Sequence, residues 1–180
     1  ARLMRTIAVS SGVIPQVSLV LGPCAGAAAY ASTLTDLVVM APDGRLVVTG
    51  PDVVASLTGE DVTLADLGGP VTHAEHSGAV HVAAADEADA LRHARALVGL
   101  LDAPGEVAAG VTDHALPRAG ERRELARALL DAHSWVELQP AWGAALITGL
   151  GRLGGRTVGV LANDPGRAGG RRDRRGPWRF

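Results

Sequence analysis

The stretch of sequence that decides the fold is Val13–Tyr30, which reads VIPQVSLVLGPCAGAAAY. Its first part, Val13–Leu21, is an apolar run rich in β-branched residues and predicts a buried strand. Gly22 and Pro23 break that run, and the small residues of Ala25–Leu34 predict a helix directly after the break. Alternation of strands and helices is typical of layered proteins with a parallel sheet, so we expect the α/β fold class.

The start of that predicted helix is the strongest candidate for a functional site. The first N–H groups of a helix have no partner within the helix and carry the positive end of its dipole. Between Gly22 and Tyr30 the side chains are small enough for a ligand oxygen to approach those N–H groups, as an oxyanion hole requires. Close packing of a strand on a helix explains the same small residues, and the spacing alone favours packing. Cys24 alone predicts a small buried apolar residue rather than a nucleophile, because no His or Lys lies near it in sequence.

The rest of the chain continues the alternation. Short apolar runs predict further strands at residues 37–40, 46–49, 145–149 and 158–162. Helical spacing of apolar residues predicts helices at residues 1–11, 51–57, 62–67, 86–101 and 121–132. The pair Gly154-Gly155 between the last two strands predicts a hairpin turn. Residues 102–120 are rich in Gly and Pro and indicate a linker.

Composition excludes several classes of protein. The chain has 180 residues, 47% of them apolar, with a formal net charge of −2, so it is no strongly basic nucleic-acid binder. Its single cysteine excludes an internal disulfide framework and a cysteine-based zinc site. The sequence shows no apolar run of about 18 residues and no signal-peptide pattern at its start, so we expect a cytoplasmic protein that does not contact a membrane.

Three histidines invite a metal hypothesis. His73, His76 and His81 lie close in sequence, with Glu75 between the first two. Their spacing matches no standard zinc pattern, and Ser77-Gly78 indicates a turn among them. We therefore expect polar histidines that form local hydrogen bonds, and no metal site.

The end of the chain differs sharply in charge from the rest. Residues 166–180 hold 6 Arg and 1 acidic residue, whereas residues 1–165 hold 11 Arg and 18 acidic residues. Arg, Gly and Trp178 together are compatible with an RNA-binding arm. A disordered tail and an out-of-frame product of GC-rich DNA are the other readings. The abrupt change near Pro165 favours the last of them, so nucleic acid is not an expected partner.

Four longer stretches carry a family resemblance: Ser11–Tyr30, Leu34–Met40, Val48–His81 and Ile147–Asp164. Together they resemble the carboxyltransferase (β) subunit of biotin-dependent acyl-CoA carboxylases, in the propionyl-CoA and acetyl-CoA branch. The resemblance implies a crotonase-like (ClpP/crotonase) α/β superhelix, incomplete here because the chain resembles an internal fragment. It implies the following division: 1–101, the C-terminal part of the N-terminal half; 102–123, a linker; 124–165, the start of the C-terminal half; and 166–180, an Arg/Gly-rich tail that is non-native or disordered.

The same resemblance implies a reaction. A carboxyl group moves from carboxybiotin, held on a separate carrier protein, to the α carbon of propionyl-CoA or acetyl-CoA. The biotin anion takes the α proton, and two pairs of backbone N–H groups stabilise the anionic oxygens without any metal. By position, the amides of Gly26 and Ala27 form one pair, with Ala27 standing where the family commonly has Gly. The substrate-binding turn before them is Gly22, Pro23, Cys24 and Ala25.

The resemblance also implies partners. These are the biotin carboxylase and biotin carboxyl carrier subunit, acyl-CoA, and further copies of the chain in a homo-oligomer. The alternative is a catalytically inactive, truncated remnant or assembly module of the same family, because the second amide pair is missing from the resemblance.

Overall fold

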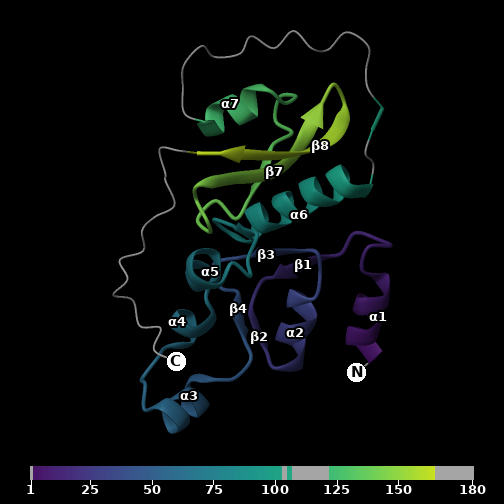
Figure 1. Ribbon diagram of the computed structural model, residues 1–180. Helices are drawn as coiled ribbons and strands as arrows, with labels where there is room; N and C mark the ends of the chain where they lie inside the picture. The colour runs from purple at the N-terminus through teal and green to yellow at the C-terminus, as the bar shows by residue number, and fades with distance from the viewer. Residues whose placement is uncertain (1, 103–104, 107–121, 165–180) are drawn as a thin grey trace. The chain divides into compact units, whose positions relative to one another are not determined.

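A computed structural model describes residues 2–102, 105–106 and 122–164 of the chain. The chain divides into two compact units, Ala1–Gly105 and Glu106–Phe180 (Figure 1). The predicted tail, and residues 103–104 and 107–121 of the predicted linker, lie outside the described residues.

The first unit is built on parallel strands. A three-stranded parallel sheet has the order β1-β3-β5, and β2 pairs in parallel with β4. The strands are β1 (Val17–Val20), β2 (Pro23–Ala25), β3 (Leu37–Met40), β4 (Arg45–Val47) and β5 (Val82–Ala83). Helix α6 (Glu87–Asp102) packs against β1 and β3, and α2 (Ala27–Thr33) lies on the other side of those strands (Figure 1). The predicted α/β class is confirmed.

Several short helices complete this unit. They are α1 (Arg2–Ser10), α3 (Pro51–Thr58), α4 (Leu64–Gly68), α5 (Pro70–Thr72) and the π-helix η1 (His73–Ser77). The predicted helices at 1–11, 51–57, 62–67 and 86–101 are confirmed within two residues at each end. Pro70 begins α5, at a position where the missing N–H of proline costs nothing.

The core of the first unit lies around β3. Val38, Val39 and Met40 are almost completely buried, as expected for the central strand of a parallel sheet. Burying each such side chain stabilises the fold by about 1.5–3 kcal/mol. A buried cluster directly under the candidate site consists of Val20, Ala29, Val38, Met40, Leu46 and Val80.

In the first unit, one predicted strand starts later than expected, and the first two residues of one predicted helix belong to a strand. The strand predicted at Val13–Leu21 begins only at Val17, because the N–H groups of Val13 and Ile14 donate to the Ser10 carbonyl and end α1. The helix predicted at Ala25–Leu34 begins at Ala27, because the preceding residues form β2. Pairing with β4, which no local pattern encodes, overrides the small-residue signal there.

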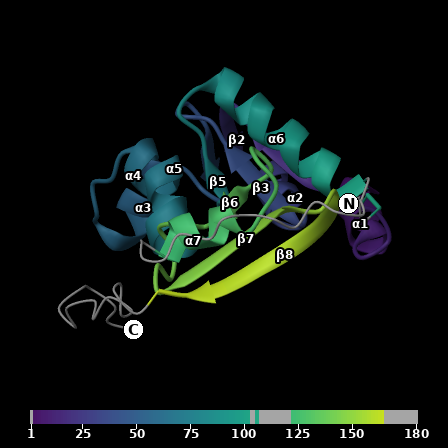
Figure 2. The ribbon, with the colours of Figure 1, turned by 90° about the horizontal axis from the view of Figure 1, so that it is seen from above.

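The second unit is an antiparallel sheet of order β6-β7-β8, seen from above in Figure 2. Its elements are α7 (Arg122–Ala128), β6 (Val136–Leu138), β7 (Leu146–Leu153) and β8 (Arg156–Asn163). Gly154 and Gly155 have φ angles of 58° and 84° between β7 and β8, which confirms the predicted hairpin turn. The helix predicted at 121–132 ends earlier, at Ala128, and the three-residue strand β6 was not predicted.

Candidate functional site

The Gly22–Ala27 turn changes the chain from strand to helix within one residue. β2 pairs with β4 so that Cys24 lies opposite Leu46 and Ala25 opposite Val47. The ladder ends where the Gly26 N–H donates to the Val47 carbonyl at 3.0 Å. Gly26 has φ 60° and ψ −126°, the conformation of the first central residue of a type II′ turn, which favours glycine. Helix α2 then begins at Ala27.

The two amides predicted to form a pair have different surroundings. The Gly26 N–H is engaged by the sheet, whereas the Ala27 N–H stands at the first helical position and has no acceptor within α2. Ala27 and Ala28 are exposed, and no side chain among the described residues caps the helix. Ala27 lies in the helix, a conformation that any L-residue adopts, so alanine in place of glycine introduces no strain there. Of the two N–H groups, the one of Ala27 is therefore the one that the sheet does not engage.

The four residues before Gly26 alternate between the core and the surface. Pro23 and Ala25 are exposed, whereas Cys24 packs against the buried cluster with its Sγ 3.7 Å from the Ser32 hydroxyl. Cys24 is therefore partly buried, where the sequence predicted a small buried residue. The Gly22 carbonyl accepts from the Arg45 N–H at 3.2 Å, so this end of the turn is also fixed by β4.

The structure corrects the expectation that the three histidines form local hydrogen bonds, because two of their hydrogen bonds join distant segments. Among the described residues, no three His, Cys, Asp or Glu side chains lie together in a way that could hold a metal ion. His73 contacts Ser77, as expected of a local hydrogen bond, but its other ring nitrogen reaches Leu46 on β4, which sequence reasoning missed. The His81 Nδ1 accepts from the Val38 N–H at 3.1 Å, and burial lowers the pKa of His81.

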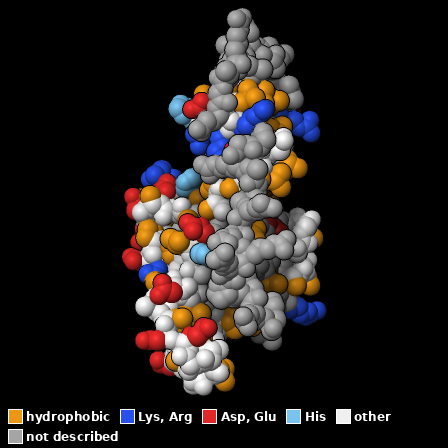
Figure 3. Space-filling view, turned by 60° about the vertical axis from the view of Figure 1, so that its left-hand side comes forward, with side chains coloured by type: hydrophobic (Ala, Val, Ile, Leu, Met, Phe, Trp, Pro, Cys, Tyr) orange, Lys and Arg blue, Asp and Glu red, His pale blue; other side chains and the backbone are white. Residues whose placement is uncertain are grey.

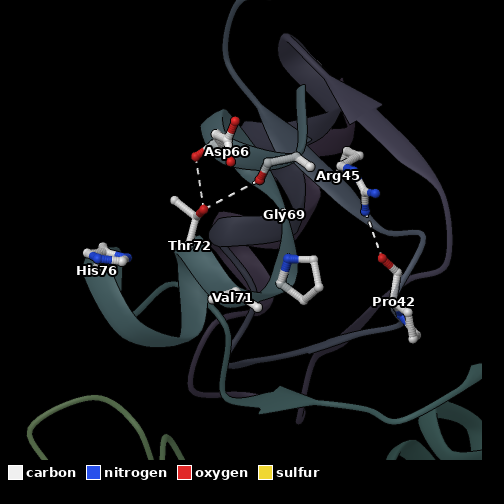
Figure 4. A pocket seen from close by; sticks show the side chains of 9 residues that line it. Pro42, Arg45, Asp66, Gly69, Val71, Thr72 and His76 are labelled. Atoms are coloured by element: carbon white, nitrogen blue, oxygen red, sulfur yellow. Dashed lines mark hydrogen bonds between the residues drawn. The ribbon is translucent and has the colours of Figure 1, made fainter. Parts of the chain in front are cut away.

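A pocket of about 770 Å³ opens beside the N-terminal end of β4 (Figure 4). Two of its polar side chains are held by the protein: the Arg45 Nη1 donates to the Pro42 carbonyl at 2.7 Å, and the Thr72 hydroxyl donates to the Asp66 carbonyl at 2.9 Å. The lining residues are Pro42, Arg45, Ala65, Asp66, Gly69, Pro70, Val71, Thr72 and His76. No residue predicted to belong to the amide site lines this pocket.

The surface near this pocket is acidic. Residues 51–66, which include α3 and part of α4, carry the exposed side chains of Asp52, Glu60, Asp61 and Asp66 and no arginine (Figure 3). Such a surface lacks the clustered cations that bind nucleic-acid phosphates. In the described part of the chain, no helix combines the length and the apolar character needed to cross a membrane.

Comparison with known proteins identifies the family of the chain. The family model of the carboxyl transferase domain matches residues 1–176. The biotin-dependent acetyl-/propionyl-coenzyme A carboxylase beta6 subunit of Mycobacterium bovis is 53% identical over 173 residues, covering 89% of this chain and 37% of that protein. The propionyl-CoA carboxylase beta chain of Rhodococcus erythropolis is 49% identical, with the same coverage of 89% and 37%. The chain thus spans just over a third of the length of these relatives.

A solved structure from a similar protein has the same fold over most of this chain. A transcarboxylase 12S crystal structure with hydrolysed methylmalonyl-coenzyme A bound superimposes with a TM-score of 0.82 at 30% sequence identity. The superposition covers 91% of this chain and 36% of the transcarboxylase chain.

Proposed function

The chain belongs to the carboxyl transferase domain family, and on that premise we propose that it forms part of an acyl-CoA carboxylase subunit that carboxylates a short acyl-CoA. Its α/β fold is part of the crotonase-like fold, as the superposition with transcarboxylase 12S shows. The observation that carries the proposal is the high identity to acetyl-/propionyl-CoA carboxylase beta subunits over nearly the whole chain. The substrates proposed are propionyl-CoA or acetyl-CoA and carboxybiotin on a carrier subunit.

In the proposed reaction, the protein stabilises charge and supplies no side-chain base. Carboxybiotin on the carrier would release its carboxyl group as CO2, and the biotin anion left behind would take the α proton of the acyl-CoA thioester. The α carbon of the resulting enolate forms the new C–C bond to the carboxyl carbon. Negative charge would collect on the thioester oxygen and on the biotin oxygen, and N–H groups already aimed at such an oxygen lower the barrier.

We assign one such donor to the Ala27 N–H, with Gly26 as the residue that aims it. The Gly26 N–H remains bound to Val47, and its unusual backbone angles turn the next N–H out of the sheet. Ala27 and Ala28 are exposed, so a ligand oxygen can approach the helix start. No metal is proposed, because N–H donors supply the charge stabilisation that the reaction needs.

Proline at position 27 tests this assignment, because it removes the N–H and leaves the helix intact. Proline is well tolerated at the first helical position, and α3 already has it there as Pro51 after Gly50. The residue before a proline prefers ψ of +120° to +160°. The Gly26 ψ of −126° lies near the mirror image of that range, which glycine adopts freely because it has no Cβ.

The experiment uses the complete subunit that contains this segment, assembled with biotin carboxylase and the biotinylated carrier. Transfer of ¹⁴C from bicarbonate into propionyl-CoA and acetyl-CoA is measured for the wild type, Ala27→Pro and the control Ala27→Gly. We expect acyl-CoA-dependent transfer by the wild type, a fall in kcat of about 100-fold for Ala27→Pro, and little change for Ala27→Gly. Absence of transfer in the wild type would overturn the function, whereas equal rates for the two variants would overturn the site.

A second candidate function, that of an assembly module without catalysis, is favoured by exposed apolar side chains. Leu3, Val9 and Val13 in the α1 region are 63%, 66% and 76% exposed. β1 lies at the edge of its sheet in the described part of the unit, and edge strands readily pair with another chain. A complete subunit that assembles with its partners but transfers no carboxyl group would support this candidate over the first.

A further inference from the structure

The contact that holds Gly26 comes from the last residue of a short strand. β4 has three residues and pairs only with β2 among the described strands, and its final residue, Val47, provides the carbonyl bound by the Gly26 N–H. The next residue, Val48, is 58% exposed. Such a strand end frays unless another group holds it. The position of the Val47 carbonyl, and with it the Gly26–Ala27 turn, therefore depends on what fixes β4.

One group that holds β4 is the ring of His73. Its Nε2 lies 2.7 Å from the Leu46 carbonyl oxygen, and its Nδ1 lies 2.7 Å from the Ser77 hydroxyl oxygen. A carbonyl oxygen can only accept, so the proton is on Nε2, and the Ser77 hydroxyl donates to Nδ1. The Ala79 N–H donates to the Ser77 oxygen at 3.2 Å, which completes a chain of hydrogen bonds from the π-helix to the strand.

A close backbone contact supports the same part of β4. Gly68, at the end of α4, is buried, and a Cβ there would collide with the Leu46 carbonyl and the Val47 side chain. The Leu46 side chain, only 4% exposed, belongs to the core cluster. Residues 46–47 are therefore held by Gly68, the core and the His73 ring. Of these contacts, the His73–Leu46 bond is the one that a side-chain substitution can delete alone.

We propose that His73 is a positioning residue for the Gly26–Ala27 turn, acting through its Nε2 bond to the Leu46 carbonyl. Its consequence for turnover rests on the proposed function, whereas its effect on the turn does not. The π-helix His73–Ser77 is the element that brings both ring nitrogens to their partners at once, and π-helical turns often mark functional sites. Ser77 orients the ring, and the ring holds the strand.

Two amide substitutions test the roles of the two ring nitrogens separately. In His73→Gln the amide nitrogen extends as far as Nε2 and can still donate to Leu46. In His73→Asn the shorter amide reaches only as far as Nδ1, so it can still contact Ser77 but leaves the Leu46 carbonyl without its donor. His76→Asn is the surface control, because His76 lies on the same π-helix and is exposed.

Hydrogen exchange of the complete subunit, followed by mass spectrometry of overlapping peptides across residues 22–30, measures the opening of the Gly26–Val47 bond. We expect His73→Asn to speed exchange at Gly26 roughly five- to ten-fold, the effect of losing one hydrogen bond on a local opening equilibrium. His73→Gln and His76→Asn keep the wild-type rate there. Equal exchange at Gly26 in the Asn and Gln variants overturns the proposal. The proposal is also overturned if the exchange rate in His73→Asn rises equally over β3 and α6, because such a rise reports general destabilisation.

Kinetics of carboxyl transfer provide the second measurement. A displaced N–H donor weakens transition-state stabilisation, so His73→Asn is expected to lower kcat about ten-fold or more with the KM for acyl-CoA nearly unchanged, and His73→Gln to restore kcat. A kcat that falls equally in both variants overturns the proposal. If the wild-type subunit transfers no carboxyl group, the proposed function fails, and the exchange rates at Gly26 alone decide the role of His73.

Discussion

Replacing Gly26 by alanine tests whether the strand-to-helix turn depends on backbone conformation alone. An added Cβ would meet no atom within 4 Å, so collision with neighbours contributes nothing to the cost. What remains is the φ of 60° with ψ of −126°, which costs an L-residue about 1–3 kcal/mol. Alanine also lowers the entropy of the unfolded chain, which reduces this cost by about 0.4–1 kcal/mol. We therefore expect Gly26→Ala to destabilise the first unit by about 1–2 kcal/mol.

The matched control is Gly50→Ala. Gly50 also precedes a helix and also has no atom within 4 Å of an added Cβ, but its φ is −83° and its ψ 167°, which alanine adopts freely. We expect this variant to change stability by less than about 0.5 kcal/mol. Asparagine does not rescue position 26, because it tolerates positive φ mainly near ψ of +50°, far from −126°.

The assay must report on the first unit. Trp135, Trp142 and Trp178 all lie outside residues 1–105, so tryptophan fluorescence does not follow this unit. Hydrogen exchange of the buried β3 amides, measured in the complete subunit, gives the free energy of opening instead. If Gly26→Ala and Gly50→Ala changed that free energy equally, the argument from backbone strain would be refuted.

Two further predictions concern polar groups. Because burial lowers the pKa of His81 below its ordinary 6.5, the folded state binds fewer protons, so stability of the first unit is full above pH 6.5 and falls as pH drops. Exchange of the Val38 amide between pH 5 and 8, corrected for intrinsic rates, should show this loss of stability. His81→Gln should abolish the pH dependence, and an unchanged pH dependence in that variant would contradict the prediction. The Asp131 carboxylate accepts from the Gly154 and Gly155 N–H groups at 2.9 and 2.7 Å. Asp131→Ala should therefore destabilise the second unit by about 1–3 kcal/mol in urea unfolding followed by tryptophan fluorescence, and an unaltered midpoint would contradict this.

Local sequence patterns were sufficient for the elements whose signals lie within a few residues. The apolar run Leu37–Met40 forms β3 with the bounds that the sequence predicted. The pair Gly154-Gly155 forms the predicted hairpin turn. α6 follows the 3.6-residue spacing of its apolar side chains. Short elements without such signals were missed: β2 and β6 have three residues each and exist because a distant strand pairs with them.

For the proposed site, the sequence indicated the place, and the roles that we propose rest on the tertiary structure. The small residues from Gly22 onward indicated a helix start without bulky side chains, because bulk and backbone freedom are properties of the residues themselves. Only the folded chain shows that the Val47 carbonyl engages the Gly26 N–H and not that of Ala27, which is why we propose Ala27 as the donor. His73 reaches β4 across 27 residues of sequence, and no local pattern encodes such a contact, because hydrogen bonds between distant segments exist only once the chain has folded.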